Sequence, residues 1–212
     1  MEHSDKKYLH EFHYPILEIC GPSGVGKSTL VRIMNEIFPS YELSISCTTR
    51  EQDPHQEVHG KHYYFTTREE FLRMKSNGEF AETNPFMKGN LYGTPWSEFL
   101  RIFQAGKVPA LDIDINGVCQ LDNVIPRSKT FRLYLDVTQE EQRARLLRRG
   151  RSTDTSEVIE KRVMYALQEK EQLLKIVESD PQMFYIKDYN TCDPIMFANT
   201  LINHLVHGHP LD

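Results

Sequence analysis

The sequence predicts an α/β fold in which helices cover both faces of a parallel β-sheet. Three observations support this prediction. Apolar runs typical of buried strands recur along the chain, segments with helical spacing separate them, and a glycine-rich loop joins the first strand to the first helix. Continuous rather than alternating hydrophobicity is typical of strands that are buried on both faces. The chain has 212 residues, of which 39% are hydrophobic and 26% charged, and this suits one domain of that kind.

Residues 1–14 are polar and are expected to form an N-terminal arm, whereas 15–212 are expected to form a single domain. The first apolar run, 15–20, leads into the sequence GPSGVGKST at 21–29, which fits the pattern G-x-x-x-x-G-K-[ST]. In this pattern backbone N–H groups surround an anion, the lysine reaches the β- and γ-phosphates, and the hydroxyl binds Mg²⁺. Helical spacing follows, so that a helix N-terminus is directed at the phosphates. The sequence therefore predicts a P-loop NTPase core that binds a nucleoside triphosphate. The predicted phosphate-binding residues are Gly21, Ser23, Gly24, Val25, Gly26, Lys27, Ser28 and Thr29.

An acidic strand end is expected beside this loop. The run at 108–113 leads into the sequence LDID, which places Asp112 and Asp114 at its carboxyl end. A carboxylate at such a position can hold the Mg²⁺ that bridges the phosphates, although many strands end in acidic residues without binding a metal. Because a complete phosphate loop precedes it, Ser28 and Asp112 are the predicted metal ligands.

Local patterns place the other elements. Capping-box patterns begin helices at Thr67 and Thr138, and Thr94, which precedes a proline, is expected to cap a further helix. The remaining expected elements are strands at 43–47, 131–135 and 184–186 and helices at 67–78, 116–124, 139–149, 156–177 and 194–207.

Two segments interrupt the α/β pattern. Residues 48–95 are rich in aromatic residues, glycines and short alternating runs, and residues 149–157 follow an arginine-rich helix. We therefore expect a core made of 15–47, 96–148 and 158–212, with two insertions.

Five arginines and no lysine occupy the arginine-rich segment, at Arg143, Arg145, Arg148, Arg149 and Arg151. Such a segment could be a solvated helix face or a nucleic-acid patch. The formal net charge of −5 does not favour attraction to nucleic acid or to an anionic membrane. The planar guanidinium suits phosphate oxygens, so we expect a lid that binds polyphosphate, with Arg143 and Arg148 at the surface.

Other residue patterns limit the cellular setting and the chemistry. The four cysteines show no C-x-x-C spacing, and free thiols in a reducing compartment are expected. We find no signal peptide and no apolar run that would span a bilayer, and the chain is expected to be cytoplasmic. Histidines at 204, 207 and 209 have no carboxylate or cysteine partner nearby in the sequence, so no metal site is predicted there.

Further motifs resemble guanylate kinase, in one order along about residues 15–205. Besides the phosphate loop, the LDID strand and the arginine lid, they are SISCTTR at 44–50, Glu57-x-x-Gly60-x-x-Tyr63-x-Phe65, Phe80-Ala81-Glu82, GNLYGT at 89–94, Thr153-Asp154-Thr155 and Glu157-Val158-Ile159. The resemblance implies a mixed α/β insertion that binds a nucleoside monophosphate at 48–95 and a short lid at 149–157. It also implies the reaction of ATP with GMP or dGMP, with Mg²⁺ as cofactor, in a monomer or homodimer without nucleic-acid or membrane partners.

The resemblance assigns the site residues by position. The guanine contacts fall on Ser46, Glu82, Thr94 and Asp114, and the contacts to the GMP phosphate on Arg50, Tyr63 and Tyr92. Lys27, Arg145, Arg149 and Arg162 are the implied catalytic residues. The base contacts are chemically consistent, because guanine offers N–H donors to carboxylates, whereas adenine N1 would leave a carboxylate facing an acceptor. An acceptor phosphate is already ionised and needs no general base.

The chain departs from the family pattern at the acceptor phosphate. The family has a second arginine three residues after the one matching Arg50, whereas the segment 51–56 is one residue longer and contains none. The lid is about two residues longer, and the family's Val-Asn-Asp near the last strand is Ile-Lys-Asp at 186–188. We therefore expect a weakened hold on the GMP phosphate, for which His55 is the only nearby substitute cation in the sequence.

Two alternatives to a GMP kinase remain. One is a guanylate-kinase-like interaction module of the type found in scaffolding proteins, which generally have degraded phosphate loops and lids. The other is a kinase of the same superfamily with a different phosphorylated acceptor. The chain keeps Lys27, Ser28, Asp112 and the lid arginines, which favours the enzyme.

Overall fold

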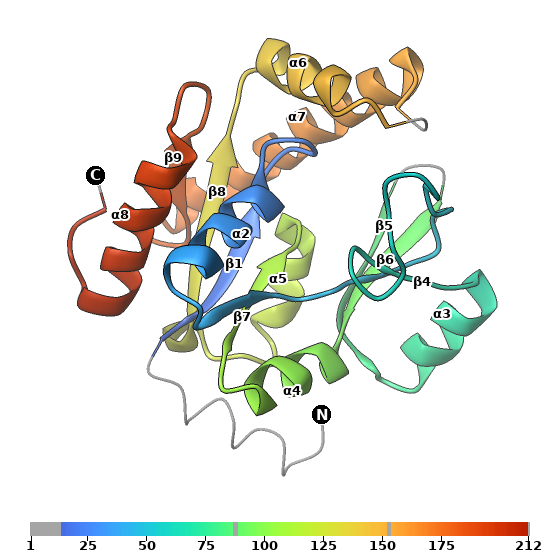
Figure 1. The fold of residues 1–212 in the computed structure, drawn as a ribbon, viewed down its shortest axis with the longest axis horizontal. Helices are drawn as coiled ribbons and strands as arrows, with labels where there is room; N and C mark the ends of the chain where they lie inside the picture. Colours follow the sequence, from blue (N-terminus) through green and yellow to red (C-terminus); the bar gives the residue numbers. More distant parts are fainter. Residues whose placement is uncertain (1–13, 87–88, 152–153, 212) are drawn as a thin grey trace.

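Two β-sheets organise the chain, with the smaller one to one side of the larger (Figure 1). The computed structural model describes residues 14–86, 89–151 and 154–211; the predicted N-terminal arm, apart from Tyr14, and Thr153 lie outside these residues. The larger sheet has five parallel strands in the order β2-β7-β1-β8-β9. The smaller sheet has the order β4-β3-β6-β5 and combines parallel with antiparallel pairs.

The parallel strands predicted at 15–20, 108–113, 131–135 and 184–186 are present in the larger sheet, although the last of them is only partly buried. Its strands are β1 (Ile16–Cys20), β2 (Tyr41–Leu43), β7 (Val108–Asp112), β8 (Thr130–Asp136) and β9 (Tyr185–Asp188). All five residues of β1 are buried, and β1 pairs with β7 on one side and β8 on the other. This central strand therefore holds the phosphate loop in a fixed position.

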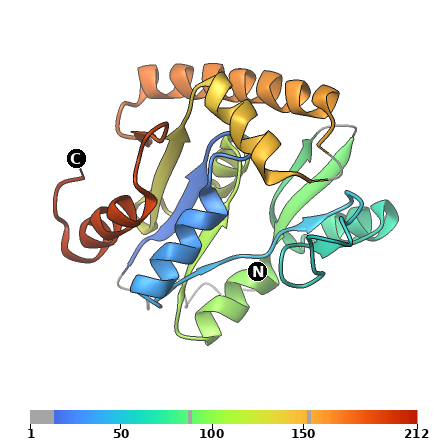
Figure 2. The ribbon, with the colours of Figure 1, turned by 45° about the horizontal axis from the view of Figure 1, so that its top comes forward.

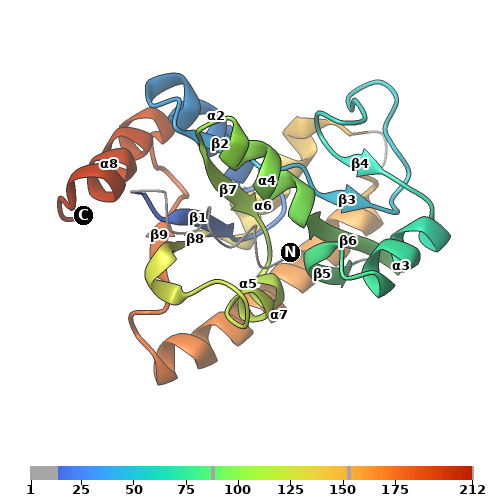
Figure 3. The same ribbon diagram turned by 90° about the horizontal axis from the view of Figure 1, so that it is seen from below.

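Helices cover both faces of the larger sheet, as predicted. They are α2 (Lys27–Ile37), α4 (Trp96–Gln104), α5 (Ile115–Leu121), α6 (Gln139–Arg149), α7 (Ser156–Ser179) and α8 (Pro194–His207), with a 3₁₀ turn η2 (Arg127–Lys129). Figure 3 shows α2 and α8 on one face of the sheet and α5 and α7 on the other. Figure 2 shows α6 beside the loop that joins β1 to α2, where Gln142 of α6 donates to the Ser23 carbonyl. None of the helices in the described part of the chain is both long and apolar enough to cross a bilayer.

The predicted strand at 43–47 is wrong. Residues 44–46 separate β2 from β3 (Cys47–Thr48), which belongs to the smaller sheet. The Ser44 N–H still donates to Ala110 of β7, but the next N–H, of Ile45, donates to the Glu98 carboxylate at 2.8 Å. Because β2 is the edge strand, no described strand faces the Ile45 N–H, and the Glu98 carboxylate accepts from it where the chain crosses to the other sheet.

The described part of the segment that forms the smaller sheet contains one helix of its own. Its other strands are β4 (Tyr64–Phe65), β5 (Phe80–Phe86) and β6 (Asn90–Pro95), and α3 (Arg68–Ser76) precedes β5. The prediction that Thr94 caps a helix is wrong, because Thr94 lies in β6 and its hydroxyl donates to Glu82 at 2.6 Å. The following helix, α4, begins without a side-chain cap.

Replacing Thr67 by alanine is expected to lower the free energy of unfolding by about 1 kcal/mol. The Thr67 hydroxyl accepts a hydrogen bond from the Glu70 N–H at 3.2 Å, as its capping-box pattern predicts, and α3 begins at the next residue. Urea unfolding of Thr67→Ala and of Thr67→Ser, which keeps the hydroxyl, measures the effect. Equal stabilities for the two variants would show that the cap contributes nothing.

Candidate active site

The phosphate loop joins β1 to α2 in the predicted strand–loop–helix arrangement. Gly21, Gly24 and Gly26 all have positive φ, at 132°, 86° and 114°. A Cβ on Gly21 would lie 2.4 Å from the carbonyl oxygen of Leu135, which is backbone and cannot move aside. The glycines are therefore required by sterics, and they let the backbone curve ahead of the N-terminus of α2.

Lys27, Ser28 and Asp112 lie together at the end of this loop. The Lys27 ammonium donates to the Gly21 carbonyl at 2.5 Å and lies 3.4 Å from the Asp112 carboxylate. The Ser28 hydroxyl is also 3.4 Å from Asp112. A hydroxyl and a carboxylate oxygen are hard ligands that suit Mg²⁺, which takes its remaining ligands from water and phosphate. Within 14–86, 89–151 and 154–211 no group of three or more His, Cys, Asp or Glu could hold a metal, so these two residues would need the nucleotide's oxygens to complete a site.

Asp154 draws two of the predicted catalytic arginines together. Arg149, in the last turn of α6, lies 2.6 Å from the Asp154 carboxylate, and Arg162, on α7, lies 3.3 Å from it. Arg162 also donates to the Ser23 hydroxyl of the phosphate loop at 2.9 Å. Burial lowers the pKa of the Arg162 guanidinium, and Asp154 opposes that shift. Two guanidinium groups therefore face the loop from the lid side.

Arg145 is placed differently. Its guanidinium donates to the carbonyl of Val25 at 2.6 Å and to that of Tyr189 at 2.7 Å. It supports the outside of the phosphate loop, and its role in neutralising phosphate charge stays a prediction. Arg143 pairs with Glu160, and the Arg148 side chain is 69% exposed, so both lie at the surface as expected.

Glu82, Thr94 and Asp114 converge from three elements. Glu82 of β5 and Thr94 of β6 are register partners, which places their side chains on one face of the smaller sheet. Asp114 is the N-cap of α5 and accepts from the Gly117 N–H at 2.8 Å. A Cβ on Gly117 would meet Glu82 Oε2 at 3.2 Å, so the carboxylate packs against α5. Ser46 lies between β2 and β3, where its carbonyl accepts from Tyr64 at 2.9 Å.

Burial perturbs both carboxylates of this group. It raises the pKa of Glu82 to about 7, with a hydrogen bond from Thr94 acting in the opposite direction and the charge of Asp114 adding to the shift. Burial likewise raises the pKa of Asp114, and the Gly117 N–H opposes the change. Buried carboxylates with perturbed pKa values are typical of functional sites.

Asn84 was not predicted as a site residue. It lies two residues after Glu82 on β5, and its amide donates to the carboxylate of Asp114. It therefore ties the smaller sheet to the acidic end of the larger one. Strand alternation from Glu82 would have placed Asn84 on the same face, but the sequence gives no indication that β5 reaches Asp114.

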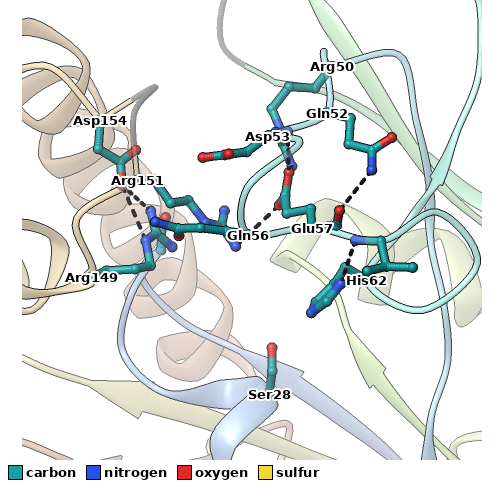
Figure 4. Close-up of polar contacts among 12 residues, drawn as sticks. Ser28, Arg50, Gln52, Asp53, Gln56, Glu57, His62, Arg149, Arg151 and Asp154 are labelled. Atoms are coloured by element: carbon teal, nitrogen blue, oxygen red, sulfur yellow. Dashed lines mark hydrogen bonds and ion pairs between the residues drawn. The ribbon is translucent and has the colours of Figure 1, made fainter.

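Arg50, Tyr63 and Tyr92 form the third cluster, which the resemblance assigns to the acceptor phosphate. The Tyr63 and Tyr92 ring centroids are 6.0 Å apart, and the Arg50 guanidinium lies 5.4 Å from the Tyr63 ring. Both oxygens of the Glu57 carboxylate bind Arg50, at 2.7 and 2.9 Å (Figure 4). The His55 side chain is exposed, and the backbone N–H of His55 donates to the Asp53 carboxylate at 3.0 Å.

Fold and site together define a P-loop phosphotransferase, with a phosphate loop, a separate pair of carboxylates with raised pKa values and an arginine of α7 that contacts the loop. The sequence profile of the family described as "Guanylate kinase" matches residues 15–183. The guanylate kinase of Lawsonia intracellularis is 40% identical over 163 residues, which are 77% of this chain and 74% of that protein. That of Streptomyces coelicolor is 41% identical over 150 residues, 70% of this chain and 73% of that protein.

A solved structure agrees with these sequence relatives. The crystal structure of guanylate kinase from Anaplasma phagocytophilum aligns with a TM-score of 0.61 and 26% identity, covering 92% of this chain and 86% of its own. The chain belongs to the guanylate kinase family. The predicted resemblance and the predicted fold class are thereby confirmed.

Proposed function

We propose that the chain transfers the γ-phosphoryl group of ATP to GMP, giving ADP and GDP. The placement of Asp112 and Asp114 carries this proposal. Asp112 ends β7 beside Lys27 and Ser28, and Asp114, two residues on, caps α5 beside Glu82. One strand end thus links the triphosphate side of the site to the base side, which supports direct transfer between two bound nucleotides.

The residues divide the chemistry between positioning and charge neutralisation. Lys27, Arg149 and Arg162 would surround the transferring phosphoryl group with positive charge, while Arg145 holds the loop. Ser28 and Asp112 would hold Mg²⁺, which when bound neutralises charge between the β- and γ-phosphates. The attacking GMP oxygen is ionised, so proton removal is not required.

Base selection follows from the acidic cluster. Guanine presents N1–H and N2–H₂ donors to Glu82 and Asp114 and its O6 acceptor to the hydroxyls of Ser46 and Thr94, of which Thr94 would have to turn from Glu82, to which it donates in the structure. The proposed contacts reach the base and the phosphate but not the 2′-hydroxyl, so dGMP is expected to be a substrate as well.

A coupled assay with GMP, dGMP, AMP, UMP and CMP as acceptors tests the proposed reaction. Turnover with GMP and dGMP far above the other three supports it. Turnover with another acceptor in place of GMP would favour a different kinase of the superfamily. Absence of turnover with nucleotide binding retained would favour an interaction module.

Affinity for guanosine is expected to rise about tenfold from pH 6 to pH 8, because Glu82 must lose a proton to accept from guanine. The pKa of Glu82, raised to about 7 in the unliganded protein, lies inside this window. Guanosine is the probe because it carries no phosphate that titrates in the same range. Titrations with the wild type and Glu82→Gln measure the effect, and a wild-type affinity independent of pH would contradict it.

The division of the domain, the cellular location, the oligomeric state and the partners are also proposals. We divide the domain into a core (15–47, 96–148 and 158–212), a GMP-binding insertion (48–95) and a lid (149–157). We propose a cytoplasmic enzyme, monomeric or homodimeric, without nucleic-acid or membrane partners. The free thiols of all four cysteines support a reducing compartment.

A further inference from the structure

Helix α5 presents one side to strand β5, which is the edge strand of the smaller sheet. Asp114, Gly117 and Gln120 recur at every third position from the N-cap of this helix, so they lie along one side of it. The Gln120 amide makes two bonds with Thr83 of β5: its Nε2 donates to the Thr83 carbonyl at 3.0 Å, and its Oε1 accepts from the Thr83 N–H at 3.1 Å. The strand is therefore held against the helix at a defined position.

The two neighbours of Thr83 direct their side chains at the same helix. Glu82 and Asn84 are two residues apart on β5, and strand alternation places them on one face of the smaller sheet. A Cβ on Gly117 would lie 3.2 Å from Glu82 Oε2, and the Asn84 amide donates to Asp114 Oδ2. The Asn84 amide therefore lies at the pair of carboxylates to which the base is assigned.

Two donors hold the Asp114 carboxylate, one on each oxygen. Oδ1 accepts from the Gly117 N–H at 2.8 Å, which is the capping bond of α5, and Oδ2 accepts from Asn84. Bonds at both oxygens fix the plane of a carboxylate, yet each oxygen has a second lone pair and can accept from another donor. The Asn84 bond therefore orients Asp114 and leaves it able to accept from a ligand.

We propose that Asn84 is a positioning residue for base selection, whose amide holds the Asp114 carboxylate in the orientation that accepts a hydrogen bond from guanine. The inference rests on the proposed function, which assigns Asp114 to the base. An amide suits this role because it donates a hydrogen bond but carries no charge, so that Asp114 keeps its negative charge for the N–H donors of guanine. A carboxylate that is held in place before the base arrives also loses less conformational entropy on binding.

A double-mutant cycle on Asn84 and Asp114 tests the proposal, with guanosine as the probe because it contains the base and no phosphate. Asn84→Ala should weaken guanosine binding about tenfold, and Asp114→Asn should weaken it at least as much. Adding Asn84→Ala to Asp114→Asn should cause little further loss, because the carboxylate that Asn84 positions is then absent. In steady-state assays Asn84→Ala should raise the KM for GMP while kcat changes little.

Three controls separate positioning from general structure. Asn84→Leu keeps approximately the volume of the side chain without its donor, and should weaken guanosine binding as Asn84→Ala does. Asn199→Ala should match the wild type, because the Asn199 amide donates only within α8, to the Ile195 carbonyl. ATP affinity should be unchanged in Asn84→Ala and Asn84→Leu. Asp114→Asn keeps an oxygen for the Gly117 N–H, so the cap of α5 is retained.

Several results would overturn the proposal. Unchanged guanosine affinity in Asn84→Ala would show that Asp114 needs no such support, and a gain in affinity would show that Asn84 competes with the base for the carboxylate. Additive losses in the double variant would mean that Asn84 acts independently of Asp114. If Asp114→Asn does not fold, the two Asn84 variants decide: equal losses of guanosine and ATP affinity would make Asn84 structural. Failure of the wild type to bind both guanosine and GMP would instead contradict the proposed function.

Discussion

Replacing Lys27 by alanine is expected to lower kcat about a thousandfold and to leave the fold intact. The Lys27 ammonium binds the Gly21 carbonyl and lies 3.4 Å from the Asp112 carboxylate. It is therefore fixed between the phosphate loop and the predicted metal ligand, where charge develops on the transferring group. A preorganised cation at that position stabilises the transition state without reorganisation cost.

Lys161→Ala is a suitable control, because Lys161 is 49% exposed and pairs only along α7 with Glu157. Single-turnover rates and thermal unfolding of both variants separate catalysis from stability. If Lys27→Ala and Lys161→Ala had similar kcat values, Lys27 would not contribute to catalysis.

Elements set by local sequence were predictable. The bounds predicted for α6 and α8 match the structure, since a capping threonine or proline begins each helix and a glycine follows each. The predicted helix at 116–124 lies at Ile115–Leu121 instead, because Asp114 caps α5 directly. The phosphate loop was predictable for a similar reason, since its function depends on residues adjacent in the chain.

Features set by contacts across the chain were not predictable. Where β2 ends, the Ile45 N–H donates to the Glu98 carboxylate, 53 residues further along the chain. Thr94 precedes a proline, which is typical of a helix cap, yet it lies in β6 and its buried hydroxyl donates to Glu82. Hydrophobic periodicity and turn-forming residues give no information about contacts between residues that are far apart in the sequence.

The substitute cation shows the same limit. The sequence offers His55 as the nearest replacement for the missing arginine, because it is nearest along the chain. In the structure the segment 51–56 turns so that the His55 side chain is exposed and Gln56 meets Gly150. Arg151 lies 3.3 Å from Glu57 although the two are far apart in the sequence, so only the fold shows this contact.

Glu82→Gln is expected to lower kcat/KM for GMP about a hundredfold or more, with ATP affinity unchanged. Glu82 Oε1 already accepts from Thr94 at 2.6 Å, and Oε2 packs against Gly117. A glutamine in this space would turn its NH₂ group either toward the Thr94 hydroxyl or toward the N–H donors of guanine. Toward guanine, a buried donor would face another donor; toward Thr94, the NH₂ group could donate to the hydroxyl oxygen, but the residue would lose the bond that it now accepts from Thr94.

Glu79→Gln is the matched control, because Glu79 is 40% exposed and pairs with Arg73 at the surface. Steady-state kinetics with GMP and binding titrations with ATP give the comparison for both variants. Because Glu82 lies on β5 of the smaller sheet, the loss of a base contact should leave ATP affinity unchanged, whereas a general folding defect would lower the affinity for both nucleotides. Equal losses for GMP and ATP in Glu82→Gln would therefore make the residue structural, whereas a loss confined to GMP would assign base selection to it.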